Sequence, residues 1–189
     1  LILLDEPFSG LDSHLKSAVR DATLNALHAA GTTALIVTHD AEEALMMADH
    51  LALMQDGQIL QVGTPQDCYQ NPVSTAAARL LGPVNVFDVV VTERGADSLF
   101  GTLPAEKIPH GAALLLLRPE AITIGQAGLA ARVSRVQFAG ANTVVTLEIH
   151  QSHSQDIVLQ GQVLSNLAPN IGETVGIEVD LTQARLVAA

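Results

Sequence analysis

The sequence predicts an α/β segment over residues 1–82, followed by an all-β segment over residues 83–189. In the first segment, short apolar runs alternate with stretches whose apolar residues recur at helical spacing. Beyond Gly82-Pro83 this helical periodicity is lost, and Gly, Pro or Asn separates most of the short β-rich runs. Such punctuation is typical of a small antiparallel barrel. Gly82-Pro83 is therefore the predicted domain boundary.

The first element is a strand that ends in two carboxylates. Four aliphatic residues precede Asp5, Glu6 and Pro7, which predicts a strand covered on both faces, as in a parallel sheet. Ligands of such sheets bind at the carboxyl ends of the strands. Adjacent acids there suit a phosphate-bound Mg²⁺: one can hold the metal's water shell while its neighbour, on the other side of the strand, orients an attacking water. The alternative at this point is a strand end with two solvated acids.

Helices and strands then alternate up to about residue 81. Asp12 or Ser13 can cap a helix that Gly31 ends, and a second apolar run, residues 34–37, leads to Thr38-His39-Asp40. The next helix, over residues 40–48, carries acids in its first turn, which favours the helix dipole. Asp-Gly predicts a hairpin between strands 51–54 and 58–62. Two short helices follow, one with Pro65 at its first position and one over residues 74–81.

The second segment contains seven β-rich runs. They cover residues 87–92, 98–103, 113–118, 130–138, 143–150, 156–162 and 174–181.

Three motifs in the first segment, in this order and at these separations, resemble the nucleotide-binding domain of ATP-binding-cassette (ABC) ATPases. Residues 1–6 resemble the Walker B strand with its glutamate, residues 9–12 resemble the D-loop, and His39 resembles the switch histidine. Gly10 stands where this family more often has alanine. The resemblance implies that residues 1–82 form part of a P-loop NTPase sheet with its helices.

The same resemblance implies a role for each motif residue. Asp5 would coordinate Mg²⁺ through water, Glu6 would act as general base or water-orienting group, and His39 would contact the γ-phosphate of ATP. Ser9, Gly10 and Asp12 would form the nucleotide-site loop that communicates with the opposite subunit. Such a site catalyses phosphoryl transfer mainly by positioning and by charge stabilisation.

Motifs in the second segment resemble the transport-associated OB-like (TOBE) domain. Leu117-Arg118-Pro119-Glu120-Ala121-Ile122 looks like its Arg-Pro-Glu motif, and residues 132–140 look like its next strand and glycine turn. Residues 61–85 resemble the end of the cassette in bacterial importers. The resemblance implies an OB-like small barrel with a regulatory role over residues 83–189.

Together these motifs imply the ATPase subunit of a bacterial ABC importer that uses ATP and Mg²⁺. Its partners would be a second copy of the subunit, membrane permease subunits and, indirectly, an external solute-binding protein. It would lie peripherally on the cytoplasmic face of the inner membrane. The run Leu99-Phe100-Gly101-Thr102-Leu103-Pro104 looks most like ferric-iron or polyamine importers, and ferric iron is the first choice of solute.

Several family motifs do not occur in the printed sequence. It has no G-x-x-x-x-G-K-[ST] loop to cradle phosphates, no Gln loop and no Leu-Ser-Gly-Gly signature. No initiator Met precedes Leu1, so we expect the chain to be the C-terminal part of a longer protein. In this family ATP is sandwiched between the phosphate loop of one subunit and the signature of the other. We therefore expect the 189-residue chain alone to be inactive toward ATP.

Composition limits the alternatives. The net charge of −11 argues against nucleic-acid binding and against a DNA-repair ATPase. The single Cys68 excludes an intrachain disulfide and suits a reducing compartment. His150 and His153 with Glu148 and Asp156 could suggest a metal site, but residues 151–155 read as a polar hairpin turn. A non-catalytic regulatory or dimerisation module that binds a small oxyanion remains the alternative function.

Overall fold

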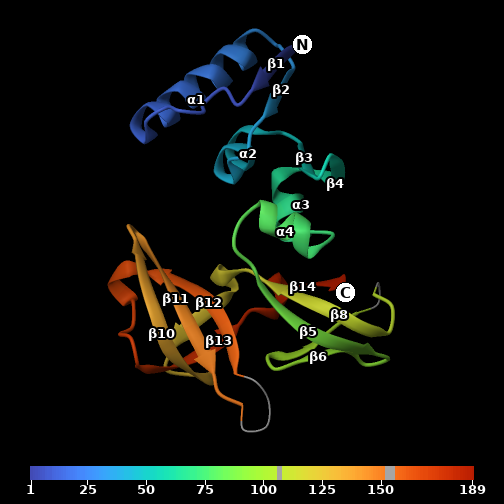
Figure 1. Cartoon of the computed structure of the whole chain (residues 1–189), viewed down its shortest axis with the longest axis vertical. Coiled ribbons are helices and arrows are strands. Elements are labelled where there is room, and N and C mark those ends of the chain that lie inside the picture. The colour runs from blue at the N-terminus through green and yellow to red at the C-terminus, as the bar shows by residue number, and fades with distance from the viewer. Residues whose placement is uncertain (106–107, 152–155) are drawn as a thin grey trace. The chain divides into compact units, whose positions relative to one another are not determined.

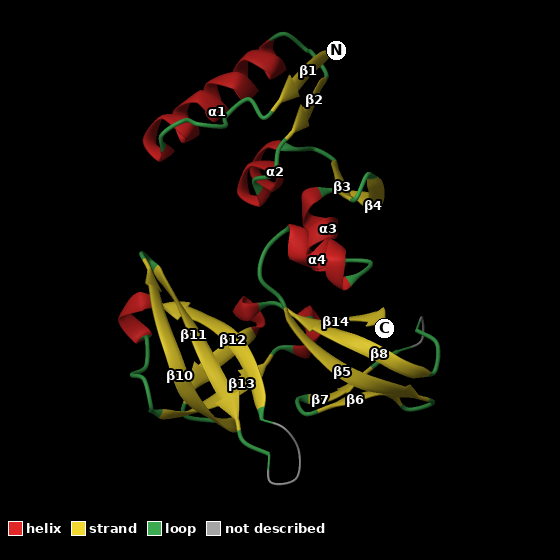
Figure 2. Ribbon diagram, in the orientation of Figure 1, coloured by secondary structure: helices red, strands yellow, loops and turns green. Residues whose placement is uncertain are grey.

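The computed structural model describes residues 1–105, 108–151 and 156–189, which form two compact units (Figures 1 and 2). The first unit consists of Leu1–Tyr69 and Leu80–Gly82, and the second of Gln70–Arg79 and Pro83–Ala189. Residues of the segment 70–79 pack on the strands of the second unit: Ala78 joins Leu116 and Val187 in a small apolar cluster.

Helices alternate with short strands in the first eighty residues. The strands are β1 (Ile2–Asp5), β2 (Ala34–Val37), β3 (Leu51–Gln55) and β4 (Gln58–Gly63). The helices are α1 (Ser13–Ala29), α2 (Ala41–Met47), α3 (Pro65–Gln70) and α4 (Thr75–Leu80).

Two strand pairs lie in the first unit. β1 and β2 are parallel, with Asp5 opposite Val37, and β3 and β4 form an antiparallel hairpin. The hairpin turns at Asp56 and Gly57, whose φ angles of 51° and 75° are left-handed, as an Asp-Gly turn requires. Gly31, with φ of 56°, follows the end of α1 in the predicted left-handed conformation.

The expectation that the first strand is covered on both faces is wrong for this structure. Ile2 and Leu3 are 41% and 69% exposed, and Leu35 on β2 is 58% exposed. The physical reason is that β1 has a single neighbour, β2, within the described part of the chain. Along β2 the exposed residues alternate with half-buried ones, so one face of this small sheet is partly covered and the other is open.

The second unit is mostly β, as the sequence predicts, and its strands form two five-stranded antiparallel sheets. The sheet in the order β14-β8-β5-β6-β7 contains Arg185–Ala188, Gly111–Leu117, Asn85–Thr92, Gly95–Ser98 and Gly101–Leu103. The sheet in the order β12-β11-β10-β13-β9 contains Ile157–Leu164, Asn142–Ile149, Leu129–Ala139, Thr174–Val179 and Ile122–Gly125. Three short 3₁₀ turns, Pro119–Ala121, Ser165–Leu167 and Leu181–Gln183, connect strands.

The second of these sheets curls toward closure. Its edge strands β12 and β9 approach each other at Gly161, where an added Cβ would lie 3.1 Å from Ile124 Cδ1. A glycine at this place lets the two strands come close. The barrel-like character of the segment is therefore confined to this sheet, and the remaining five strands form the other sheet.

Some strands differ from the sequence prediction. The predicted run 98–103 is not one strand: it contains the end of β6 at Ser98, a turn, and β7, which begins at Gly101 with φ of 126°. The Ser98 hydroxyl closes this turn by donating to the carbonyl oxygen of Gly101 at 2.7 Å. Strands β9 and β14, each of four residues, were not predicted.

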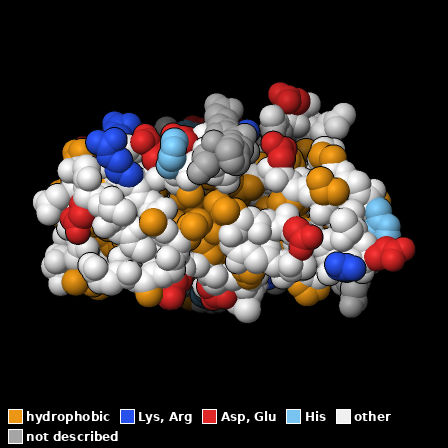
Figure 3. All heavy atoms as spheres, turned by 90° about the horizontal axis from the view of Figure 1, so that it is seen from below, with side chains coloured by type: hydrophobic (Ala, Val, Ile, Leu, Met, Phe, Trp, Pro, Cys, Tyr) orange, Lys and Arg blue, Asp and Glu red, His pale blue; other side chains and the backbone are white. Residues whose placement is uncertain are grey.

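Both sheets share one hydrophobic core. Leu115 and Leu117 of β8 and Val145 and Leu147 of β11 are fully buried in it. Figure 3 shows that a group of apolar side chains also reaches the surface in the middle of the face seen from below. Within the described residues, no helix is both long and apolar enough to cross a membrane.

A buried asparagine joins the two sheets. The Asn85 side chain on β5 donates from Nδ2 to the carbonyl oxygen of Gln160 on β12 at 2.8 Å. The Gln160 backbone N–H donates back to Asn85 Oδ1 at 2.7 Å. Asn85 thus pairs with β12 as a neighbouring strand would, although the two strands belong to different sheets. The N–H and carbonyl groups of Gln160 on this side of the strand are thus both paired by the Asn85 side chain.

We predict that Asn85→Ala destabilises the β-region by about 1–3 kcal/mol, because two part-buried hydrogen bonds between the sheets are lost. Urea unfolding followed by far-ultraviolet circular dichroism measures the change. Asp88→Ala, on the exposed side of the same strand, is the matched control and should leave the unfolding midpoint nearly unchanged. Equal midpoints for the two variants would show that the Asn85 bridge does not stabilise the fold.

Candidate functional site

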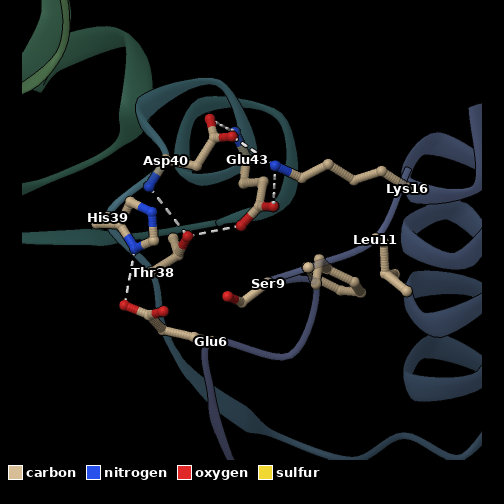
Figure 4. Close-up of a pocket in the computed structure, with 10 residues that line it drawn as sticks. Glu6, Ser9, Leu11, Lys16, Thr38, His39, Asp40 and Glu43 are labelled. Atoms are coloured by element: carbon tan, nitrogen blue, oxygen red, sulfur yellow. Dashed lines mark hydrogen bonds and ion pairs between the residues drawn. The ribbon is translucent and has the colours of Figure 1, made fainter. Parts of the chain in front are cut away.

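A small hollow lies where β1 and β2 end in the first unit (Figure 4). Its volume is about 130 Å³. Pockets that enclose a whole small molecule measure roughly 300–1,000 Å³, so this hollow can take only a small group. Its lining is polar apart from Phe8 and Leu11, and consists of Glu6, Phe8, Ser9, Gly10, Leu11, Lys16, Thr38, His39, Asp40 and Glu43.

The parallel pairing of β1 with β2 brings Glu6 and His39 together. The Glu6 backbone N–H donates to the Val37 carbonyl oxygen at 2.8 Å and so continues the ladder one residue beyond β1. Glu6 then adopts a left-handed conformation, with φ of 44°, that a non-glycine residue rarely takes. Its Oε1 lies 2.7 Å from Nδ1 of His39, the second residue after β2.

The Glu6–His39 contact sets the charge of the imidazole. The hydrogen bond to Glu6, and then the negative charge of Glu6, raise the pKa of His39 above its ordinary value. Desolvation of the ring opposes this increase in pKa, and Asp40 and Glu43 add smaller effects that raise the pKa. His39 is 77% exposed and Glu6 43% exposed, so the pair is open to solvent and to a ligand.

Lys16 gathers the other polar groups of the hollow. Its Nζ lies 2.6 Å from Asp40 Oδ2 and 2.7 Å from Glu43 Oε1, so the ammonium bridges two carboxylates of α2 and its cap. Glu43 is 7% exposed, and its second oxygen accepts from the Thr38 hydroxyl at 2.6 Å. The Thr38 hydroxyl in turn accepts from the Asp40 backbone N–H at 3.1 Å. Figure 4 shows these contacts as a closed polar ring beside His39.

Asp40 also begins α2. Its Oδ1 accepts from the backbone N–H groups of Glu42 and Glu43 at 2.9 and 3.2 Å, which is the geometry of an N-cap. The Lys16 ammonium, and to a smaller extent these backbone donors, hold the pKa of Asp40 below its usual range. Asp40 and Glu43 conversely raise the pKa of Lys16. The ring thus pairs the Lys16 ammonium with the carboxylates of Asp40 and Glu43.

Comparison with known proteins assigns the chain to a family. Residues 115–187 match the sequence model of the TOBE domain. The chain is 34% identical over 187 residues to the protein named Fe(3+) ions import ATP-binding protein FbpC 2 of Pectobacterium atrosepticum, covering 95% of this chain and 54% of that protein. It is 36% identical over 188 residues to the Fe(3+) ions import ATP-binding protein FbpC of Rhizobium etli, covering 94% and 53%.

The chain is homologous to the C-terminal part of ABC importer ATP-binding subunits. It spans about half the length of the curated relatives it matches. A more distant likeness is to a solved structure of the cytoplasmic molybdate-binding protein ModG with molybdate bound, at a TM-score of 0.43 and 13% identity. That match covers 56% of this chain and 96% of the other.

The structure collects four of the six residues that the ABC resemblance assigns to the site. Glu6, Ser9, Gly10 and His39 line the hollow. Gly10 has a left-handed φ of 77°, which glycine adopts without strain. The other two lie outside the lining. Asp5 is exposed at the end of β1, and Asp12 occupies the N-cap position of α1 without a side-chain cap bond.

Lys16, Thr38, Asp40 and Glu43 had no assigned role in the sequence prediction. Asp40 and Glu43 stand three positions apart at a helix start, which is the spacing of a capping box and was a usable signal. Lys16 gave no signal, because its partners are 24 and 27 positions away in the sequence.

The histidine-rich turn of the second unit does not form a metal cluster in the part of the chain that the structure describes. His150 Nδ1 lies 2.8 Å from Asp156 Oδ1, and both side chains are exposed. No group of three or more His, Cys, Asp or Glu residues gathers among the described residues. His153 and most of the predicted hairpin turn lie outside them.

We predict that Glu6→Gln lowers the pKa of His39 toward its ordinary value, because the amide keeps a hydrogen-bond acceptor but loses the charge. Since Glu6 raises the His39 pKa in the folded chain, the contact stabilises the fold fully below about pH 6.5, the ordinary histidine pKa. This contribution is lost as the pH rises through the raised pKa of the folded state. NMR titration of the His39 ring proton, assigned with His39→Asn, measures the shift.

Glu42→Gln is the matched control for this prediction. Glu42 lies in the first turn of α2 and is exposed, and it is not among the groups that shift His39. The control should leave the His39 titration unchanged. An identical His39 titration in Glu6→Gln would mean that the two side chains are not paired in solution.

Proposed function

We propose that this chain belongs to the ATP-binding subunit of an ABC importer, and that Glu6 and His39 act together on the γ-phosphate of ATP. One observation carries the proposal: an acid and a histidine, 2.7 Å apart, stand side by side at the carboxyl ends of two parallel strands. Parallel α/β sheets bind their ligands at this edge.

The chemistry of each side chain suits this role. The Glu6 carboxylate can orient a water molecule and accept its proton during attack on phosphorus. A histidine whose pKa is raised stays protonated further toward neutral pH, so His39 can donate a hydrogen bond to a phosphate oxygen. The hollow admits the terminal phosphate but not a whole nucleotide, which leaves the base and sugar to be bound elsewhere. Ser9, Gly10 and Asp12 would face the second copy of the subunit.

We infer that the site uses Mg²⁺. Asp5 presents an exposed carboxylate beside Glu6, and no larger group of ligands gathers around it among the described residues. This donor set fits Mg²⁺, which keeps several water ligands and takes the rest from one or two carboxylates and substrate phosphates. The ion would neutralise the phosphate charge near a hollow that is lined by three acids. Asp5 would hold it through its water shell.

The same proposal covers partners and location. As in the subunits it resembles, we propose that the protein lies on the cytoplasmic face of the membrane, where it contacts permease subunits and pairs with a second copy. The relatives named above are called Fe(3+) import proteins, which supports ferric iron as the solute. The chain itself would not contact the solute, because selectivity resides in the permease and the external binding protein.

We predict that this chain alone does not hydrolyse Mg·ATP, because turnover requires a phosphate loop and a signature motif. Fused behind a segment that supplies both, taken from an ABC importer subunit, it should gain Mg²⁺-dependent ATPase activity. Glu6→Gln in this hybrid should lower kcat by about 10²–10⁴-fold, the usual contribution of a general base. Phosphate release measures the rate.

Glu93→Gln makes the same chemical change at an exposed position of the second unit and serves as the control. Turnover by the chain alone, or a hybrid whose rate is the same with and without Glu6→Gln, would contradict the proposal.

A further prediction concerns the solute. The hybrid, expressed in a bacterium that lacks its own ferric-import ATPase subunit, should restore uptake of radioactive ferric iron, because it should couple to the ferric permease. Glu6→Gln should abolish the uptake. An active hybrid that supports polyamine uptake in the corresponding strain, but not iron uptake, would reject iron as the solute and leave the ATPase assignment intact.

A further inference from the structure

His39 is held by its neighbours in the chain rather than by its own packing. The imidazole is 77% exposed, and its Nδ1 is hydrogen-bonded to Glu6. Thr38 and Asp40, on either side of it, are both fixed by the polar ring described above. The position of the imidazole therefore depends on how firmly these two residues are held.

Thr38 and Asp40, which flank His39, are both connected to the Lys16 ammonium. Asp40 contacts the Lys16 ammonium directly at 2.6 Å. Thr38 reaches it through Glu43, whose two carboxylate oxygens bind the Thr38 hydroxyl at 2.6 Å and the Lys16 ammonium at 2.7 Å. The Glu43 side chain is only 7% exposed, so without Lys16 it would be a buried carboxylate with no counter-charge. We therefore expect the ring to lose this geometry when the cation is removed.

Lys16 also stands close to the loop formed by residues 9–12. Its backbone N–H donates to the Asp12 carbonyl oxygen at 2.8 Å, in the first turn of α1. A displacement of this loop would move the first turn of α1, and with it the ammonium that holds the ring. The path from the loop to His39 runs through directly contacting groups: Asp12, Lys16, Asp40 with Glu43, and Thr38.

We propose that Lys16 is a positioning residue: it fixes the His39 imidazole by holding Thr38 and Asp40, and it links the loop of residues 9–12 to His39. The effect of Lys16 on catalysis rests on the proposed function. Its effect on the position of His39 does not. The Lys16 ammonium contacts Asp40 and Glu43, so it acts on the Glu6–His39 pair through the ring.

Two possible effects of removing Lys16 change the pKa of His39 in opposite directions. The charged side chains that line the hollow with His39 are Glu6 from the end of β1, Asp40 and Glu43 from α2 and its cap, and Lys16 from α1. Removal of the Lys16 charge alone would raise the pKa of His39, because a nearby positive charge disfavours protonation. Loss of His39 positioning would lower this pKa, because the contact with Glu6 would be weakened. NMR titration of His39 in the whole 189-residue chain separates the two effects.

We expect Lys16→Met to lower the His39 pKa toward its ordinary value, and Lys16→Arg to restore it. Thr38→Val should lower it too, although this change alters no charge and nearly preserves the side-chain shape. In a Glu6→Gln background, Lys16→Met should cause no further decrease. Arg20→Met is the control: it removes a charge from the same helix, and Arg20 contacts Met46 of α2 without touching the ring.

Amide exchange of Glu42 and Glu43, whose N–H groups are capped by Asp40, reports whether α2 remains folded in each variant. If Lys16→Met unfolds the first unit, Thr38→Val decides the question. A His39 pKa that is unchanged or raised in a folded Lys16→Met, or unchanged in Thr38→Val if Lys16→Met unfolds, would overturn the proposal.

This titration needs no nucleotide, so its failure is distinct from a failure of the ATPase assignment. In the active hybrid, Lys16→Met should lower kcat with little change in KM for ATP, and Lys16→Arg should recover it, because a displaced His39 affects the transition state more than ground-state binding. A hybrid without ATPase activity would reject the proposed function while leaving the His39 titration interpretable.

Discussion

The parallel pairing of β1 with β2 is the constraint on which the site depends. Parallel strands end at the same edge of a sheet, so the residues that follow them emerge side by side although 33 positions separate Glu6 from His39 in the sequence. The register, with Asp5 opposite Val37, determines which residues meet. A shift by one residue would exchange the faces of the strand and turn these side chains away from each other.

Glu6 and His39 are held in contact in two different ways. On the β1 side, the backbone itself turns: Glu6 takes a left-handed conformation immediately after its last ladder hydrogen bond. On the β2 side, side chains hold the backbone, because Asp40 caps α2 while Lys16 and Glu43 complete the ring. Backbone strain is thus concentrated at Glu6, and the ion pairs lie next to His39. Both are features that functional sites commonly show.

The charges that line the hollow explain why the proposed binding of a phosphate group would need an added cation. The hollow is lined by three acids and by the Lys16 ammonium, whose contacts to Asp40 and Glu43 occupy it. A phosphate group entering the hollow would meet a net negative charge, with protonated His39 as the donor that remains available. Mg²⁺, together with a phosphate loop, would supply the missing positive charge.

Local signals in the sequence predict much of the fold. Gly31 and the Asp56-Gly57 turn lie where left-handed residues are required, and both are found in that conformation. Local sequence signals do not predict features that depend on how distant segments pack. The exposure of Leu3 depends on how many strands flank β1, and the partners of Lys16 depend on the packing of α1 against α2. In the second unit, Gly101 splits what looks like one β-rich run into a hairpin, because a single φ angle decides between continuation and reversal.

The ends of β1 and β2 place an acid and a histidine in direct contact. A nuclear Overhauser effect between the γ protons of Glu6 and the Hε1 proton of His39 tests it most directly, because Hε1 lies beside Nδ1, the atom that contacts Glu6. We expect a clear cross-peak in the 189-residue chain. Absence of this cross-peak, with both spin systems assigned, would contradict it.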